Sequence, residues 1–227
     1  MHKKALNIFL VWLTVFSVNT LIAQSNDPFG YIEKCNQRID SIRNYAASFT
    51  VKSDIPMLKM PVVQGKMFFK WPAHYSVSTY RFTVLPKRKL APIVRFLKRE
   101  DFKVLSRGTE AVNGTDCMVI QLAPLDTLSK IENFVIWVDT TAGLVYRVLI
   151  KEKDESKFVY QYTYAEDGDI LPSGLSYTFE YRQQQAQKVS LNPFALFGNW
   201  EEPKMIKGKI TMDFHYTEIR REGDKAR

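Results

Sequence analysis

The pattern that most constrains this chain is an alternation of apolar and polar residues, which recurs in about ten segments from Ala46 onward. A period of two is typical of β-strands that bury one face and expose the other. Most connections between the segments are too short to hold a crossover helix, so neighbouring strands should run antiparallel. About ten such strands are expected to curl into a barrel or near-barrel. The expected strands are residues 47–53, 63–71, 74–82, 102–112, 115–123, 132–139, 144–152, 157–165, 174–185 and 207–219.

Two features of these segments refine the expected sheet. Asn113-Gly114 separates two of the strands and is typical of a type I′ turn, in which both central residues have positive φ. Residues 132–139 and 144–150 are apolar on both faces. These two strands should therefore lie centrally, with further side chains packed on the second face.

An amphipathic helix is expected ahead of the strands, over residues 29–45. Apolar residues recur there at spacings of three and four, and charged residues occupy the other face. Asp27 followed by Pro28 is a suitable start, because aspartate caps helices and proline fits the first helical position. The apolar positions are Ile32, Cys35, Ile39, Ile42 and Tyr45.

The first 23 residues have the layout of a secretory signal peptide. Two lysines precede an apolar run from Leu6 to Val18, and Ala23 provides the small residue expected before the cut. A membrane anchor is the alternative, but the run is shorter than the roughly 20 residues that a spanning helix needs. We therefore expect cleavage after Ala23, export to the periplasm, and one soluble domain over residues 24–227.

Positive charge is concentrated in one segment. Cleavage removes the two lysines and lowers the net charge from +8 to +6, and residues 87–103 alone carry a net +5. One concentrated patch favours docking to an anionic membrane surface or an acidic partner over nucleic acid. A solvated charged loop is the alternative. Within the segment, residues 90–99 are expected to form a short basic amphipathic helix. The candidate docking residues are Lys87, Arg88, Lys89, Arg95, Lys98 and Arg99.

The chain offers no pattern for catalysis or metal binding. Its two cysteines and three histidines have no metal-ligand spacing, and no paired acid, base or nucleophile stands out. We therefore expect neither an enzyme nor a bound metal or cofactor. Export would permit a disulfide between Cys35 and Cys117, and two separate buried thiols are the alternative.

One long connection, residues 184–207, carries large apolar side chains although it also contains proline and glycine. A loop that only connects two strands should be polar, and long loops in compact domains often act as lids. Together with the helix, this loop is expected to cover the apolar face of the sheet. The candidate lid residues are Ile39, Ile42, Leu191, Phe194, Phe197 and Trp200.

Two stretches of the sequence share a recognisable order of residues. They are Tyr45-Ala46-Ala47-Ser48-Phe49-Thr50-Val51-Lys52, directly after the helix, and Gln64-Gly65-Lys66-Met67-Phe68-Phe69-Lys70-Trp71-Pro72. Together they resemble the N-terminal third of the periplasmic outer-membrane lipoprotein carrier family, the LolA-like proteins related to LolB and RseB. The resemblance implies a half-open antiparallel β-barrel with a helical lid, around an apolar cavity that holds lipid acyl chains. The family's arginine before the proline is replaced here by Trp71.

The sequence thus predicts a monomeric periplasmic carrier that shields a lipid or lipoprotein acyl chain and ferries it toward the outer membrane. Because the expected helices are too few to cover the sheet, its interior is either filled by its own side chains or leaves an apolar cavity. A continuous void of at least about 300 Å³ would support carriage. An RseB-like sensor or protein-interaction module is the alternative, with residues 191–200 as its binding surface. The candidate cavity-wall residues are Phe69, Trp71, Tyr75, Val77, Ile120, Ile136, Tyr160, Tyr177, Phe179, Met212 and Phe214.

Overall fold

The computed structural model describes residues 27–56, 60–72, 74–79, 97–165, 169–182 and 205–224. The expected signal peptide and the apolar loop at 191–200 lie outside these ranges. Within them the protein is mainly β, as expected, with one α-helix, one 3₁₀ turn and ten strands. The elements are α2 (Pro28–Asp40), β1 (Ile42–Asp54), β2 (Val63–Lys70), β3 (His74–Thr79), η4 (Arg99–Asp101), β4 (Phe102–Val112), β5 (Thr115–Pro124), β6 (Ile131–Asp139), β7 (Leu144–Glu152), β8 (Lys157–Thr163), β9 (Gly174–Arg182) and β10 (Met205–Arg221).

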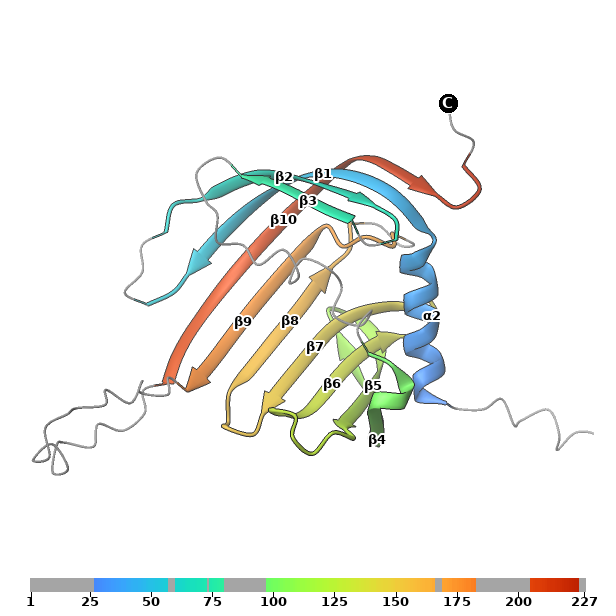
Figure 1. Cartoon of the computed structure of the whole chain (residues 1–227), viewed down its shortest axis with the longest axis vertical. Helices are drawn as coiled ribbons and strands as arrows, with labels where there is room; N and C mark the ends of the chain where they lie inside the picture. The colour runs from blue at the N-terminus through green and yellow to red at the C-terminus, as the bar shows by residue number, and fades with distance from the viewer. Residues whose placement is uncertain are drawn as a thin grey trace, which may run out of the picture.

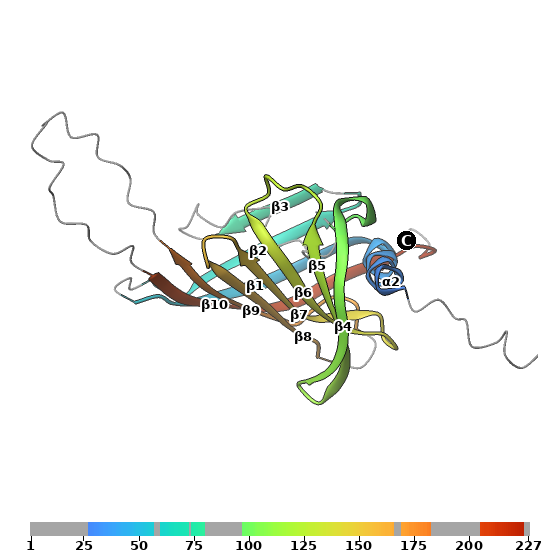
Figure 2. The ribbon, with the colours of Figure 1, turned by 90° about the horizontal axis from the view of Figure 1, so that it is seen from below.

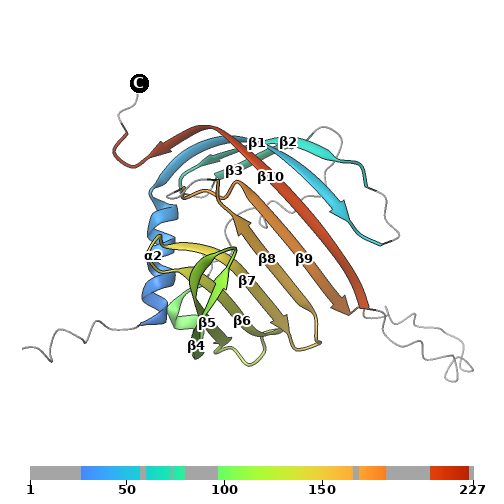
Figure 3. The same ribbon diagram turned by 180° about the vertical axis from the view of Figure 1, so that it is seen from behind.

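All ten strands belong to one antiparallel sheet that does not close. The strand order is β3-β2-β1-β10-β9-β8-β7-β6-β5-β4, so β3 and β4 are the two edges. Figures 1 and 2 show the sheet curving strongly while these edges stay apart. The last strand, β10, lies between β1 and β9 (Figure 3). It therefore joins the group of strands β1 to β3 to the group β4 to β9. The expected half-open antiparallel architecture is confirmed.

The helix α2 begins where the sequence predicts but ends earlier. The Phe29 backbone N–H donates to the Asp27 carboxylate at 3.1 Å, which caps the first turn. The helix ends at Asp40 and not at Tyr45, because β1 pairs with β10 from Ile42 onward. Arg43 is an extra residue in this pairing. The resulting bulge turns Ile42 and Tyr45, three residues apart, to the same buried face and so imitates a helical period.

The expected turn between β4 and β5 is confirmed, since Asn113 has φ 53° and Gly114 has φ 83°. The strands β6 and β7, which are apolar on both faces, lie third and fourth from the β4 edge and not at the centre. Their second face carries a small cluster of its own on the convex side of the sheet, as expected. It contains Val112, Cys117 and Trp137, with Val119, Val135, Tyr146 and Leu149 packed against them.

The two cysteines are separate buried thiols, which corrects the possible disulfide. Cys35 belongs to the main core on the concave side, whereas Cys117 belongs to the convex cluster, so the sheet lies between them. Burial raises the pKa of the Cys35 thiol to about 12 and that of Cys117 to about 11. Both side chains therefore act as small apolar groups.

The helix α2 lies at the end of the sheet formed by the turn between β6 and β7 (Figures 1 and 3). Its buried residues Phe29, Ile32 and Cys35 join the concave core. The Lys34 ammonium donates to the Thr140 carbonyl oxygen at 2.9 Å, and the Arg38 guanidinium donates to that of Ala142. One helix at one end leaves the rest of the concave face to be covered by other means.

Replacing Gly65 by alanine should lower the free energy of unfolding by about 1–3 kcal/mol. A Cβ atom at residue 65 would lie 2.5 Å from the Phe49 ring and 2.7 Å from the Ser78 carbonyl oxygen. The backbone oxygen cannot move aside without disturbing the pairing of β2 with β3. Urea denaturation measures the loss. Gly108→Ala in β4 is the matched control, because nothing lies within 4 Å of its added Cβ, and an equal loss there would contradict the packing explanation.

Candidate functional site

On β8 and β9, the apolar side chains of the concave face become less buried with distance from α2. On β9, Leu175 is buried and borders a cavity beside α2, whereas Tyr177 and Phe179, further along the strand, are half-buried. On β8, Tyr160 is buried and Phe158, further from α2, is half-buried. The concave face therefore continues as an apolar surface beyond the part that α2 covers.

Aromatic rings form a continuous row across β8 and β9. The Tyr160 and Tyr177 ring centroids are 4.7 Å apart, those of Tyr177 and Phe179 are 5.6 Å apart, and Phe158 stacks nearly parallel to Tyr177 at 6.4 Å. Burial raises the pKa of both Tyr160 and Tyr177, so their hydroxyls stay uncharged at neutral pH. The row offers flat apolar surface with an occasional hydroxyl, which suits an apolar chain better than an ion.

A second aromatic group lies on the other half of the concave face, across β10, β1, β2 and β3. Tyr45 stacks on Phe69 at 5.1 Å and meets Tyr216 edge-on at 5.5 Å, while Phe69 packs on Tyr75 at 4.9 Å. The Tyr216 hydroxyl donates to the Pro172 carbonyl oxygen at 3.0 Å. These contacts hold the wall of the sheet next to the last turn of α2.

Two apolar cavities lie between α2 and the sheet, and both are small. One has a volume of about 30 Å³ and includes Ile39, Tyr45, Phe69 and Tyr75 in its lining. The other has a volume of about 20 Å³ and is lined in part by Cys35 and Ile39. Each has room for little more than one water molecule. A cavity of at least about 300 Å³, the size that would support carriage, is thus not open beside α2 in this conformation.

The structure brings most of the predicted wall residues together on the concave face. Two of them, Ile120 and Ile136, are 0% exposed and belong to the closed core, so they offer no surface to a ligand in this conformation. Trp71 is the exception: it follows the end of β2 and is 44% exposed. Because it lies past the end of the strand, the alternation along β2 does not assign its side chain to the concave face. The concave positions are Phe69, Tyr75, Val77, Ile120, Ile136, Tyr160, Tyr177, Phe179, Met212 and Phe214.

The predicted lid residues divide between the helix and the sheet. Ile39 lies on α2 and borders both cavities, so it is the described residue that best fits a lid. Ile42 lies on β1 and is buried in the core, so its placement on a lid helix was wrong. Leu191, Phe194, Phe197 and Trp200 lie outside the described residues.

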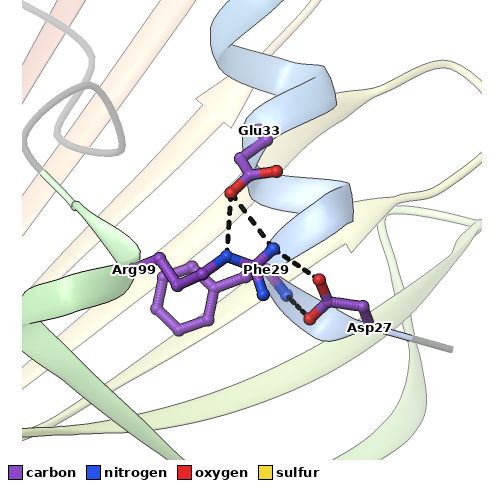
Figure 4. Close-up of polar contacts among 4 residues, drawn as sticks. All are labelled: Asp27, Phe29, Glu33 and Arg99. Atoms are coloured by element: carbon purple, nitrogen blue, oxygen red, sulfur yellow. Dashed lines mark hydrogen bonds and ion pairs between the residues drawn. The ribbon is translucent and has the colours of Figure 1, made fainter. Parts of the chain in front are cut away.

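Arg99 holds the first turn of α2, as Figure 4 shows. Its guanidinium forms ion pairs with the Asp27 carboxylate and, at 3.1 Å, with Glu33, and it lies 5.4 Å from the centre of the Phe29 ring. The hydrogen bond from Arg99 lowers the pKa of the Asp27 carboxyl, and the two carboxylates raise the pKa of Arg99. Sequence reasoning missed this contact, since the partners are more than 60 residues apart.

The predicted docking patch is only partly described. Lys98 is exposed and lies 3.9 Å from Glu100, whereas Arg99 is engaged with α2. Lys87, Arg88, Lys89 and Arg95 lie outside the described residues. Arg99 therefore has a structural partner within the fold and does not stand as a free cation for docking.

Replacing Arg99 by glutamine should raise the rate at which Cys35 reacts with a thiol reagent several-fold. Cys35 lies on the buried face of α2 and becomes accessible only when the helix lifts, and Arg99 fastens that helix at its first turn. The experiment uses a Cys117→Ala background so that Cys35 is the thiol whose reaction is measured. Lys103→Gln, in β4, is the control. Because the pKa of Asp27 is lowered, the attachment should persist above about pH 4 and weaken below it. Unchanged Cys35 reactivity in Arg99→Gln would contradict this role.

Two further properties of the described residues bear on the class of protein. None of their helices is long and apolar enough to span a membrane. Nor do they contain a group of three or more histidine, cysteine, aspartate or glutamate residues placed to hold a metal ion.

The similarity of this chain to known proteins is confined to solved structures and is distant. No family model and no curated protein matches the sequence. Among solved structures, the chain is similar to a DUF1329 family protein from Desulfovibrio piger, with 11% identity over 88% of this chain and 96% of that chain and a TM-score of 0.49. A LolA superfamily protein from Nitrosomonas europaea is 9% identical over 86% and 94% of the two chains, with a TM-score of 0.47.

A chain of the Pseudomonas aeruginosa MucA/MucB complex is also similar, with 10% identity over 86% of this chain and 99% of that chain and a TM-score of 0.31. The structural neighbours thus include the LolA and MucB groups. Similarity this distant assigns neither a ligand nor a partner. The function has to be inferred from the residues of this chain.

Proposed function

We propose that this protein is a periplasmic carrier that binds a lipid or lipoprotein acyl chain against the concave face of the sheet, with α2 as a lid. Binding and transfer toward the outer membrane, without a chemical step, is the proposed activity. The resemblance of residues 45–52 and 64–72 to lipoprotein carriers supports the class of ligand. The apolar face that runs past α2 supports its location.

One observation carries the proposal: the aromatic row of Phe158, Tyr177 and Phe179 stays half-buried where the core should be sealed. An acyl chain laid along this row would complete the burial. Each methylene taken out of water contributes roughly 0.8 kcal/mol, so a long chain needs no charged contact to be held. In this proposal the chain enters beside Ile39, which borders both small cavities, by displacing the last turn of α2.

The connection between α2 and the sheet suits such a movement. A single residue, Ser41, separates the end of the helix from β1, and the Ser41 hydroxyl donates to the Arg38 carbonyl oxygen at 2.7 Å. The ion pairs of Arg99 and the hydrogen bonds of Lys34 lie at the surface, and the hydrogen bond from Arg38 to the Ala142 carbonyl oxygen is half-buried. A swing of the helix about Ser41 would therefore break mainly surface contacts, which costs less than breaking buried ones.

Purified protein should release acyl lipids into organic solvent, and the delipidated protein should bind a fluorescent fatty acid. Mass spectrometry of the extract and a fluorescence titration measure the two properties. Phe179→Asp should weaken the probe's affinity at least about tenfold, because an acyl chain on the row would force a carboxylate out of water. Leu105→Asp, at an exposed position of β4, is the matched control and should bind normally. A lipid-free extract together with no probe binding would sink the proposal.

A further inference from the structure

Two large aromatic side chains are exposed near one end of β2, Phe68 on the convex face of the strand and Trp71 just past its last residue. Along β2, Val63, Gly65, Met67 and Phe69 are buried, so the residues between them face outward. Phe68 is one of these and is 51% exposed. Trp71, 44% exposed, follows at the end of the same strand. Two large exposed aromatic side chains three residues apart in the sequence favour a surface that meets a partner.

Cations flank Phe68 on both sides. In the strand register, Lys70 lies opposite Asn44 of β1, and Asn44 lies opposite Arg220 of β10. On the other side of Phe68 lies Lys66, also exposed. Phe68 lies opposite Ala46 of β1, and Ala46 lies opposite Glu218 of β10. Glu218 is thus the carboxylate in line with Phe68 across these strands, compared with three cations in the neighbouring positions. We call Lys66, Phe68, Lys70, Trp71 and Arg220 the convex corner.

The fold holds Trp71 in its exposed position. Its backbone N–H donates to the Arg43 carbonyl oxygen at 2.7 Å, and the Arg43 guanidinium lies 4.5 Å from the centre of its ring. Arg43 is in turn fixed by an ion pair with Glu222. An exposed tryptophan that is already ordered loses little conformational entropy when it binds.

A groove of about 530 Å³ with both polar and apolar lining opens beside Lys66. Most of its lining comes from outward-facing positions of β1, β2 and β3. Hydroxyl and amide side chains dominate, with Lys66 as the charged member. Such a lining can donate several hydrogen bonds to one anionic group. The lining residues are Ser48, Phe49, Thr50, Gln64, Gly65, Lys66, Ser78 and Thr79.

We propose that the convex corner docks the protein onto a bilayer surface rich in anionic phospholipid. Phe68 and Trp71 enter the boundary between headgroups and acyl chains, where amphipathic and aromatic side chains are favoured. Lys66, Lys70 and Arg220 face the phosphates, and the groove beside Lys66 takes a headgroup. The surface faces away from the concave site and includes none of residues 87–99. It goes beyond the proposed carriage of an acyl chain, and supplies the contact with a donor or acceptor membrane.

Sedimentation of residues 24–227 with lipid vesicles tests the docking surface. The chain should bind vesicles that contain phosphatidylglycerol and phosphatidylcholine, bind pure phosphatidylcholine weakly, and release as salt is raised. Lys66→Glu/Lys70→Glu should lower the partition coefficient at least about 25-fold, since each cation near an anionic surface is worth about fivefold. Phe68→Ser should lower it at least about fivefold through lost apolar burial.

Matched variants on other surfaces separate this site from general effects. Lys130→Glu/Lys157→Glu makes the same charge change at exposed positions, and Leu128→Ser removes an apolar side chain that is 90% exposed. Both should sediment with vesicles as the parent chain does. Equal loss in these controls, or unchanged binding of Lys66→Glu/Lys70→Glu, would overturn the proposal. So would a dimer that Phe68→Ser converts to a monomer, because the corner would then belong to a second copy.

The docking proposal and the carriage proposal are tested by separate measurements, so either can be contradicted without the other. Vesicle binding is measured with no added fatty acid, and fatty-acid binding is measured with no vesicles. Lys66→Glu/Lys70→Glu should take up the fluorescent fatty acid like the parent chain, since both lysines face away from the concave site. Charge reversal at Lys87, Arg88 and Lys89 shows separately whether that basic segment contributes to sedimentation.

Discussion

Locking α2 to the sheet by a disulfide between positions 34 and 143 should reduce the affinity for a fluorescent fatty acid at least about tenfold. The pair is Lys34→Cys with Gly143→Cys. A Cβ atom at residue 143 would lie 3.5 Å from Lys34 Cγ, which is compatible with disulfide geometry. If the ligand enters only when the helix lifts, the cross-link removes the competent state, and apparent affinity falls with its population. Fluorescence titration of the oxidised and reduced forms measures the change.

Reduction is the internal control for this experiment. It should restore the affinity of the double variant, although the positive φ of 63° at Gly143 makes a side chain there strained. A Cys35→Ala background prevents mispairing with the neighbouring native thiol. Lys34→Cys alone should bind like the parent. If the oxidised form binds the fatty acid as tightly as the reduced form, α2 is not a lid.

Replacing Ile136 by alanine should lower the free energy of unfolding by about 2–5 kcal/mol. Its side chain is 0% exposed and lies between Ile120 of β5 and Val148 of β7 in the strand register, both also 0% exposed. Truncation there leaves a cavity that its neighbours on both sides cannot close. Such a loss is a large part of the total stability of an ordinary domain. Chemical denaturation in urea, monitored by circular dichroism, measures it.

The size of that loss also shows whether Ile136 lies in a packed core or lines a cavity that could hold a ligand. Leu128→Ala, at a side chain that is 90% exposed, should change the free energy of unfolding by less than about 0.5 kcal/mol. A small loss for Ile136→Ala, close to that of Leu128→Ala, would mean that the region under Ile136 is hollow. In that case Ile136 would be assigned again to the wall of the ligand cavity.

The strands were largely predictable because one face of each is buried. The alternation of Ile210, Met212 and Phe214 with polar residues places β10 within two residues of its observed ends. The strands at 102–112 and 144–152 match in full. Tight turns with residues such as Asn113 and Gly114, which adopt positive φ, mark where each strand stops.

The errors arose where a local pattern had two meanings. The spacing of Ile39, Ile42 and Tyr45 fits a helix, but a bulge at Arg43 produces the same burial in a strand. Alternation places Trp71 on the inner face, yet the strand has already ended at Lys70. A periodic pattern gives a direction for each side chain only while the regular element continues.

Other parts of the candidate site could not be predicted from local sequence at all. Inward-facing Ile120 and Phe179 look alike in the sequence, and only the position of α2 makes one closed core and leaves the other half-buried. The contact of Arg99 with Asp27 joins distant segments. A long-range contact of this kind leaves no periodic signal in the sequence.

Isotope-filtered nuclear Overhauser spectroscopy with a ¹³C-labelled fatty acid tests the central claim most directly. The claim is that the acyl chain lies on the concave face along Phe158, Tyr177 and Phe179. We predict contacts from the labelled methylenes to the ring protons of these residues, and to the Ile39 methyl groups once the chain is bound. Contacts confined to convex residues such as Phe68 or Trp137, with the concave row unchanged, would contradict the account.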